Sequence, residues 1–277
     1  MILPVEIYRH IVYYVSDKND LRRLLYTSHI LKSEAERSLL RSINMDLQLS
    51  SLPAVTQARR RHLAQKFELI LRNPELASAV QELHYRPNVI PEDLIEATFP
   101  LLSNLSRLHL PSYHPIFNRC TFHLKFLLIN ADDSFTSEFF KFFTSQSSIR
   151  DLLVWNEIAV PLDSLPNLTT LSFFSWQSTR LLLGRQVARL RVYCELGDDD
   201  LSDRGLENIR VLVINRLKGD LACSSLGNLE YLTVVDVRNI HLLLSFRILI
   251  NTIVGLTLNL GSKATKAQET GGLAILR

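Results

Sequence analysis

Leucine recurs along most of the chain in a short pattern. An apolar residue is followed three positions later by leucine, and two positions after that by a second apolar residue. The leucine and the last apolar residue alternate with positions that are mostly polar, which is typical of a short strand with one buried face. The pattern occurs nine times, and its central leucines are Leu83, Leu108, Leu127, Leu152, Leu171, Leu190, Leu212, Leu232 and Leu256.

Consecutive motifs begin 19 to 25 residues apart, and turn residues or helical patterns separate them. This spacing resembles that of leucine-rich repeats, whose period is about 20–29 residues. The Asn or Cys that follows the strand in well-formed repeats is mostly missing here, so the resemblance is to degenerate, irregular repeats. It implies an α/β solenoid with a parallel sheet over residues 80–260. An ordinary α/β domain with parallel strands is the alternative.

The N-terminal segment before these motifs predicts three short helices. Pro4 suits the first position of a helix, because the N–H that it lacks would be unpaired there. Asp20 is the expected N-cap of a second helix over 21–25, and Ser28 that of a third. Helices of this size cannot bury all their apolar residues against one another, so we expect an uncovered apolar seam. On the first helix this seam contains Ile7, Ile11 and Val15.

Several of these residues, taken together, resemble an F-box, the adaptor-binding module of SCF-type ubiquitin ligases. They are Leu3-Pro4-x-Glu6-Ile7, Ile11, Val15, Asp20-Leu21-x-x-Leu24, Thr27-Ser28 and Glu34-Ala35-Glu36-Arg37. The aromatic residue often found early in the third helix of an F-box is Leu31 here. The resemblance implies docking on a Skp-type adaptor and, through it, on a cullin. The residues that we expect at the docking surface are Leu3, Pro4, Ile7, Ile11, Val15, Leu21, Leu24 and Leu31.

These patterns divide the chain into four parts. Residues 1–45 form the F-box-like module and 46–79 a helical linker. The linker begins with a helix over Thr56–Arg72 that ends at Asn73-Pro74, and a second short helix over Glu75–Val80 follows. The repeat-like region covers 80–260. The polar, glycine-containing stretch 261–277 predicts a disordered tail.

Composition narrows the possible partners and locations. The 277 residues are 47% hydrophobic, which predicts a folded chain, and a net charge of +3 is too small to indicate binding to nucleic acid. Three widely spaced cysteines without a Cys-x-x-Cys motif favour a reducing cytoplasmic or nuclear location. Charged and amide side chains interrupt the apolar stretch 240–260, so we expect a buried helix and strand there and no membrane span.

Catalytic motifs are absent from the sequence. It has no His-Glu-x-x-His, Gly-x-Ser-x-Gly or Walker-type motif, and no two histidines are spaced to share one helix face. The acidic group around Asp198 lacks the Gly and Glu that a calcium loop needs, so it predicts a polar turn. We therefore expect a protein that is not an enzyme and that needs no cofactor or metal.

The strand positions that alternate with the buried leucines predict the face that binds a target. They place Arg107, His109, Phe126, Asp151, Thr170 and Thr233 on the concave side of the sheet, together with the residues we expect to bind the target. Aromatic residues and arginine dominate many protein interfaces. The target-binding residues that we expect are Trp155, Phe174, Arg189, Arg191, Tyr193 and Tyr231.

Two functional classes fit these patterns. The first is the substrate-recognition subunit of an SCF-type ubiquitin ligase, which binds the adaptor through its N-terminal helices and a protein target through its repeats. The second is a repeat-type interaction scaffold whose helices only cap the array and which has no role in ubiquitin transfer.

Overall fold

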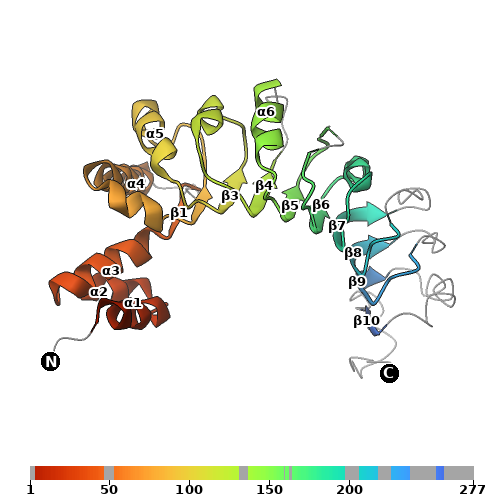
Figure 1. Ribbon diagram of the computed structural model, residues 1–277, viewed down its shortest axis with the longest axis horizontal. Coiled ribbons are helices and arrows are strands. Elements are labelled where there is room, and N and C mark those ends of the chain that lie inside the picture. Colours follow the sequence, from red (N-terminus) through yellow and green to blue (C-terminus); the bar gives the residue numbers. More distant parts are fainter. Residues whose placement is uncertain are drawn as a thin grey trace. The chain divides into compact units, whose positions relative to one another are not determined.

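The structure is a computed structural model that describes residues 4–46, 53–130, 137–158, 160–161, 164–196, 206–217, 226–237 and 254–258. The chain forms two compact units, Met1–Leu124 and Lys125–Arg277. Both are built of parallel strands joined by helices and loops, as the sequence predicts (Figure 1). Within the described residues, no helix is both long enough and apolar enough to cross a membrane.

The first unit begins with three helices, α1 (Val5–Tyr14), α2 (Lys18–Leu24) and α3 (His29–Leu40). The third helix begins as predicted, because the Ser28 hydroxyl accepts a hydrogen bond from the Leu31 N–H at 3.3 Å. The prediction for the second helix was wrong. Asp17 is its N-cap and accepts from the Asn19 N–H, since the helix begins at Lys18, two residues before Asp20.

A strand that the sequence analysis missed follows α3. Strand β1 (Ser42–Asn44) pairs in parallel with β2 (Glu82–His84), and Ile43 lies opposite Leu83. Arg41 links the helices to this strand pair. Its carbonyl accepts hydrogen bonds from the N–H groups of Gln81 and Glu82, and its guanidinium lies 5.0 Å from the centre of the Tyr13 ring.

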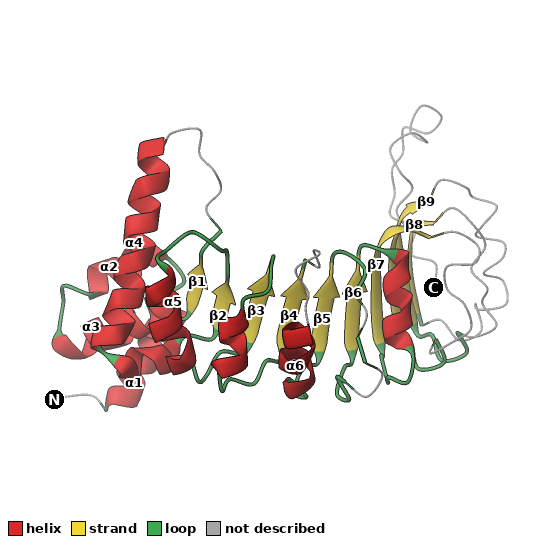
Figure 2. Ribbon diagram, turned by 90° about the horizontal axis from the view of Figure 1, so that it is seen from above, coloured by secondary structure: helices red, strands yellow, loops and turns green. Residues whose placement is uncertain are grey.

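The rest of the first unit consists of further helices and one more strand. These elements are α4 (Pro53–Arg72), η1 (Pro74–Ala79), α5 (Glu92–Thr98), η2 (Phe99–Leu101), β3 (Arg107–Leu110) and η3 (Pro115–Arg119). Helices α4 and α5 lie on one side of the strands (Figures 1 and 2). Buried aromatic rings pack in the core of this unit. The ring centres of Tyr85 and Phe117 are 5.4 Å apart, and those of Phe67 and Phe99 are 6.0 Å apart.

The described residues of the second unit form seven strands that pair in chain order and in parallel. Each strand lies at one of the predicted motifs, so the strand predictions are confirmed. Helix α6 (Ser137–Ser145) buries Phe139, Phe142 and Phe143, and η4 (Trp176–Leu182) precedes the fourth strand. The strands are β4 (Phe126–Ile129), β5 (Asp151–Val154), β6 (Thr170–Phe173), β7 (Arg189–Leu196), β8 (Val211–Leu217), β9 (Tyr231–Val237) and β10 (Gly255–Leu258).

Some predicted features lie outside the described residues. They are Leu3, the acidic turn around Asp198, the helix expected before Leu256, and the tail 261–277.

Side chains also connect several repeat units to the units before them. An asparagine stands one residue before the first apolar position of several motifs and donates to a carbonyl of the preceding unit. Asn104 donates to Ser78, Asn167 to Ser147 and Asn228 to Glu207, over 2.6 to 3.0 Å. These bonds hold the turns that lead into β3, β6 and β9.

Arg185 is the most buried arginine of the described residues, with 4% of its surface exposed. Its guanidinium donates to the carbonyls of Ser164, Leu181, Leu183 and Pro161, over 2.7 to 3.3 Å. It therefore joins residues 161–164 to residues 181–183, and it supplies a buried donor to the carbonyls of Ser164 and Leu181.

We expect Arg185→Met to lower the free energy of unfolding by about 2–4 kcal/mol, because buried carbonyls that lose their donors carry a desolvation cost. Arg180→Met is the matched control, since the Arg180 side chain is exposed and forms a surface ion pair with Glu157. Chemical denaturation of both variants measures the difference. Equal stability of the two variants would contradict this role for Arg185.

Candidate functional site

The N-terminal helices bury some of the predicted docking residues and leave others exposed. Ile7 and Ile11 are 43% and 48% exposed on α1, one turn apart. Leu21 is buried in the core of the three helices, and Val12 fills the position on α1 that faces this core. The helices therefore pack together while part of the apolar surface of α1 remains in contact with solvent.

The remaining predicted docking residues are distributed over the same helices. Pro4 is exposed, and Val15, Leu24 and Leu31 are half-buried. Three tyrosines that the sequence analysis did not include, Tyr13, Tyr14 and Tyr26, are also exposed. An ion pair between Arg9 and the buried Glu34, 3.2 Å apart, holds α1 against α3.

In the second unit, three of the predicted target-binding residues form a stack of aromatic rings. The rings of Trp155 and Phe174 are 4.1 Å apart and 8° from parallel, and those of Phe174 and Tyr193 are 4.5 Å apart and 12° from parallel. We call these three residues the aromatic ladder. Trp155 is 44% exposed, so the end of the ladder is accessible to a partner.

Strand register produces the ladder. Val154 lies opposite Phe173, and Phe173 opposite Val192, so the three aromatic residues that follow them occupy equivalent positions. Neighbouring strands lie about 4.8 Å apart, which is close to the distance at which flat rings stack. The sequence predicted that these residues share a face, and the pairing of the strands brings their rings together.

The other predicted target-binding residues lie along β7 and β9. Arg191 is exposed two positions before Tyr193. Arg189 and Tyr231 line an open cleft of about 650 Å³, together with Arg210 and Glu230. The cleft lies at the first residues of β7, β8 and β9. This face therefore offers stacked rings, guanidinium groups and a recess on neighbouring strands.

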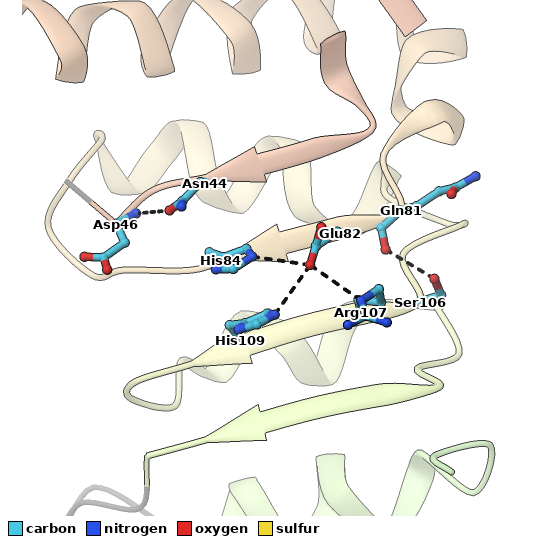
Figure 3. A network of polar contacts seen from close by, with 8 residues as sticks. All are labelled: Asn44, Asp46, Gln81, Glu82, His84, Ser106, Arg107 and His109. Carbon is cyan, nitrogen blue, oxygen red and sulfur yellow. Dashed lines mark hydrogen bonds and ion pairs between the residues drawn. The ribbon is translucent and has the colours of Figure 1, made fainter. Parts of the chain in front are cut away.

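A polar cluster on the first unit was not predicted. Figure 3 shows Glu82 and His84 on β2 beside Arg107 and His109 on β3. One carboxylate oxygen of Glu82 lies 3.4 Å from Nε2 of His84, 3.6 Å from Nε2 of His109 and 3.5 Å from Nε of Arg107. The two imidazole rings stack with their centres 3.6 Å apart. We call Glu82, His84 and His109 the histidine–glutamate cluster.

Two histidines that share one helix face are visible in the spacing of the sequence, whereas these histidines pair across two strands. His84 and His109 each follow the central leucine of their motif, and they lie opposite each other in the strand register. Aligning the repeat units by their leucines would have placed them side by side. Within the described residues, this is the only group of three His, Cys, Asp or Glu side chains whose ligand atoms are close enough to hold a metal ion.

The surroundings of the cluster change the ionisation of its members. Burial, followed by the charge of His84, lowers the pKa of His109 to about 4. Burial disfavours the ionised carboxylate of Glu82. The hydrogen bond from Ser42 and the positive charges of His84 and Arg107 outweigh that effect and lower the pKa of Glu82. At neutral pH, Glu82 is therefore ionised and His109 is neutral.

Comparisons with known proteins find likenesses to solved structures, in 12 chains. No protein-family model and no curated protein sequence matches the chain. An internalin from Listeria monocytogenes, known from a crystal structure, is 14% identical, with 78% of this chain and 80% of the internalin covered and a TM-score of 0.41.

We expect the pKa of His109 to make the stability of the protein depend on pH. The unfolded chain protonates this histidine near pH 6.5 and the folded chain only near pH 4, so the free energy of unfolding falls as the pH falls between these values. The lowered pKa of Glu82 adds a loss in the same direction at lower pH. The loss from His109 is on the order of 2 kcal/mol.

Denaturation at a series of pH values, in buffer with a chelator, measures this dependence. His109→Gln should flatten the slope between pH 6.5 and pH 4, and His123→Gln, which changes an exposed histidine, should leave it unchanged. Parallel curves for wild type and His109→Gln would show that another group causes the loss.

Proposed function

We propose that this chain is the substrate-recognition subunit of an SCF-type ubiquitin ligase. Helices α1 to α3 bind a Skp-type adaptor, and through it a cullin, while the exposed face of the sheet binds a protein target. The observation that carries the proposal is the apolar surface of α1, where Ile7 and Ile11 remain exposed although the helices have packed together.

The adaptor part of the proposal combines this surface with the F-box resemblance. The two isoleucines present apolar area that a partner chain can bury. Each side chain that becomes fully buried contributes about 1.5–3 kcal/mol to the free energy of binding. Tyr14, three positions after Ile11 and also exposed, extends the surface by one more turn of α1. Aromatic rings of this kind contribute strongly to protein interfaces.

The target part of the proposal depends on the aromatic ladder. Stacked rings lose little conformational entropy when a partner covers them, because strand pairing already holds them in place. Arg191, on strand β7 with Tyr193, supplies a positive charge on a long side chain beside the rings. In this function the protein performs no chemical step itself, and its contribution to ubiquitin transfer is to hold the target near the transferring enzyme.

A second candidate function is an interaction scaffold without a role in ubiquitin transfer. The observation in its favour is the direct connection of α3 to β1, through Arg41, which attaches the helices to the first strand as a cap. Such a cap covers the end of a repeat array that would otherwise expose an apolar flank. The two functions differ in whether the helices bind an adaptor.

We expect the double variant Ile7→Asp, Ile11→Asp to lose adaptor binding. Placing two charges on the docking surface removes about 2 kcal/mol of apolar contact, which is roughly thirtyfold in affinity. Co-purification of the full chain with a Skp-type adaptor measures the loss. Val55→Asp, which changes an exposed valine on α4, serves as the control and should bind normally. Wild-type binding by the double variant would favour the scaffold function.

Truncation of the ladder should weaken target binding and leave adaptor binding unchanged. Proximity labelling in cells with the wild-type chain identifies the target, and its affinity is then measured for Trp155→Ala, Tyr193→Ala and the control Tyr26→Ala. Loss of a central aromatic contact costs about 2 kcal/mol or more. Equal affinity of all three variants for the labelled protein would place the target site elsewhere.

A further inference from the structure

The histidine–glutamate cluster has the composition of a transition-metal site. Its three donors are two imidazole nitrogens and one carboxylate oxygen, and they all lie within 4.8 Å of one another. Imidazole suits zinc and neighbouring transition metals, whereas calcium and magnesium prefer oxygen ligands alone. The donor set therefore selects a metal that accepts nitrogen.

The distances within the cluster are close to those of a zinc site. Bonds of about 2.0–2.1 Å in a tetrahedron place neighbouring ligand atoms about 3.3–3.4 Å apart. The Glu82 oxygen lies 3.4 Å from Nε2 of His84 and 3.6 Å from Nε2 of His109. Two edges of the tetrahedron are thus present within a few tenths of an ångström.

We propose that Glu82, His84 and His109 bind a zinc ion on the exposed face of the first unit. Three protein ligands leave the fourth position of the tetrahedron for water or for a side chain of a bound protein. Metal binding here is independent of the adaptor and of the target proposed above. The zinc ion would lie on a face of the sheet where the sequence predicts none of the target-binding residues.

Two neighbours of Glu82 act on this site in opposite directions. The Ser42 hydroxyl hydrogen-bonds to the carboxylate and orients it, as groups around metal ligands commonly do. The Arg107 guanidinium, 3.5 Å from the same carboxylate, repels a cation. The Arg107 side chain is 51% exposed, so it can turn toward solvent when the ion binds. Its charge must nevertheless weaken the affinity.

The stacked imidazoles also respond to the ion. Their rings are 13° from parallel, so the lone pairs of the two nitrogens lie in nearly parallel planes. Binding of both nitrogens to one ion requires the rings to turn toward each other, and their stacking is then reduced. Strands β2 and β3 hold the two backbones in register, so the change is confined to the side chains.

Calorimetric titration of the metal-free full chain with ZnCl₂ at neutral pH tests the site. We expect one zinc ion per chain. The variants His84→Gln and His109→Gln should each bind at least about tenfold more weakly, as expected when a metal ligand is lost. His123→Gln is the matched control, because it removes an exposed histidine away from the cluster, and it should bind like the wild type. Co²⁺ in place of zinc should give the visible absorption of a tetrahedral site.

Arg107→Gln provides a test that does not depend on the folding of the ligand variants. Removal of the guanidinium should tighten zinc binding several-fold, and zinc should raise the melting temperature of both this variant and the wild type. A polar cluster that binds no metal would show neither effect. Absence of zinc binding, equal binding by the two His→Gln ligand variants and the wild type, or an affinity that Arg107→Gln leaves unchanged would each overturn the proposal.

Discussion

The strands pair in parallel with the central leucine of each strand opposite the central leucine of the next. This register determines which side chains of neighbouring repeat units lie beside each other. Leu83 lies opposite Leu108 in the first unit, and Leu127, Leu152 and Leu171 lie opposite one another in the second. The buried leucines hold the register because a slip by one residue would turn every one of them toward solvent. Each exposed position is consequently aligned with the equivalent position of the neighbouring unit.

Both unusual surfaces of the protein arise from this alignment. When equivalent positions carry aromatic residues, the rings stack, as in the ladder at Trp155, Phe174 and Tyr193. When they carry histidines, the imidazoles stack and their nitrogens reach the same carboxylate, as at His84 and His109. Strand pairing, rather than a specially shaped loop, supplies the geometry of each surface.

The sequence predicts this architecture where the motif is strict and misses it where one residue departs. All nine motifs with a central leucine form strands, whereas β1 was missed because Ile43 occupies the position of the leucine. The aromatic residues could be assigned to one face from the alternation alone. Alternation along a single strand does not reveal the histidine–glutamate cluster, because its members come from two repeat units. Aligning these repeat units by their central leucines is the step that places His84 opposite His109.

Arg41 has a consequence for where the chain can be divided. It is the one residue between α3 and β1, and its carbonyl pairs with the backbone of the next strand. A cut after residue 45 would leave β1 as a strand with no neighbour, and such edges readily pair with other chains. Transfer of the N-terminal helices onto another repeat array would therefore succeed only if β1 found a matching strand there, so the useful junction lies before Ser42.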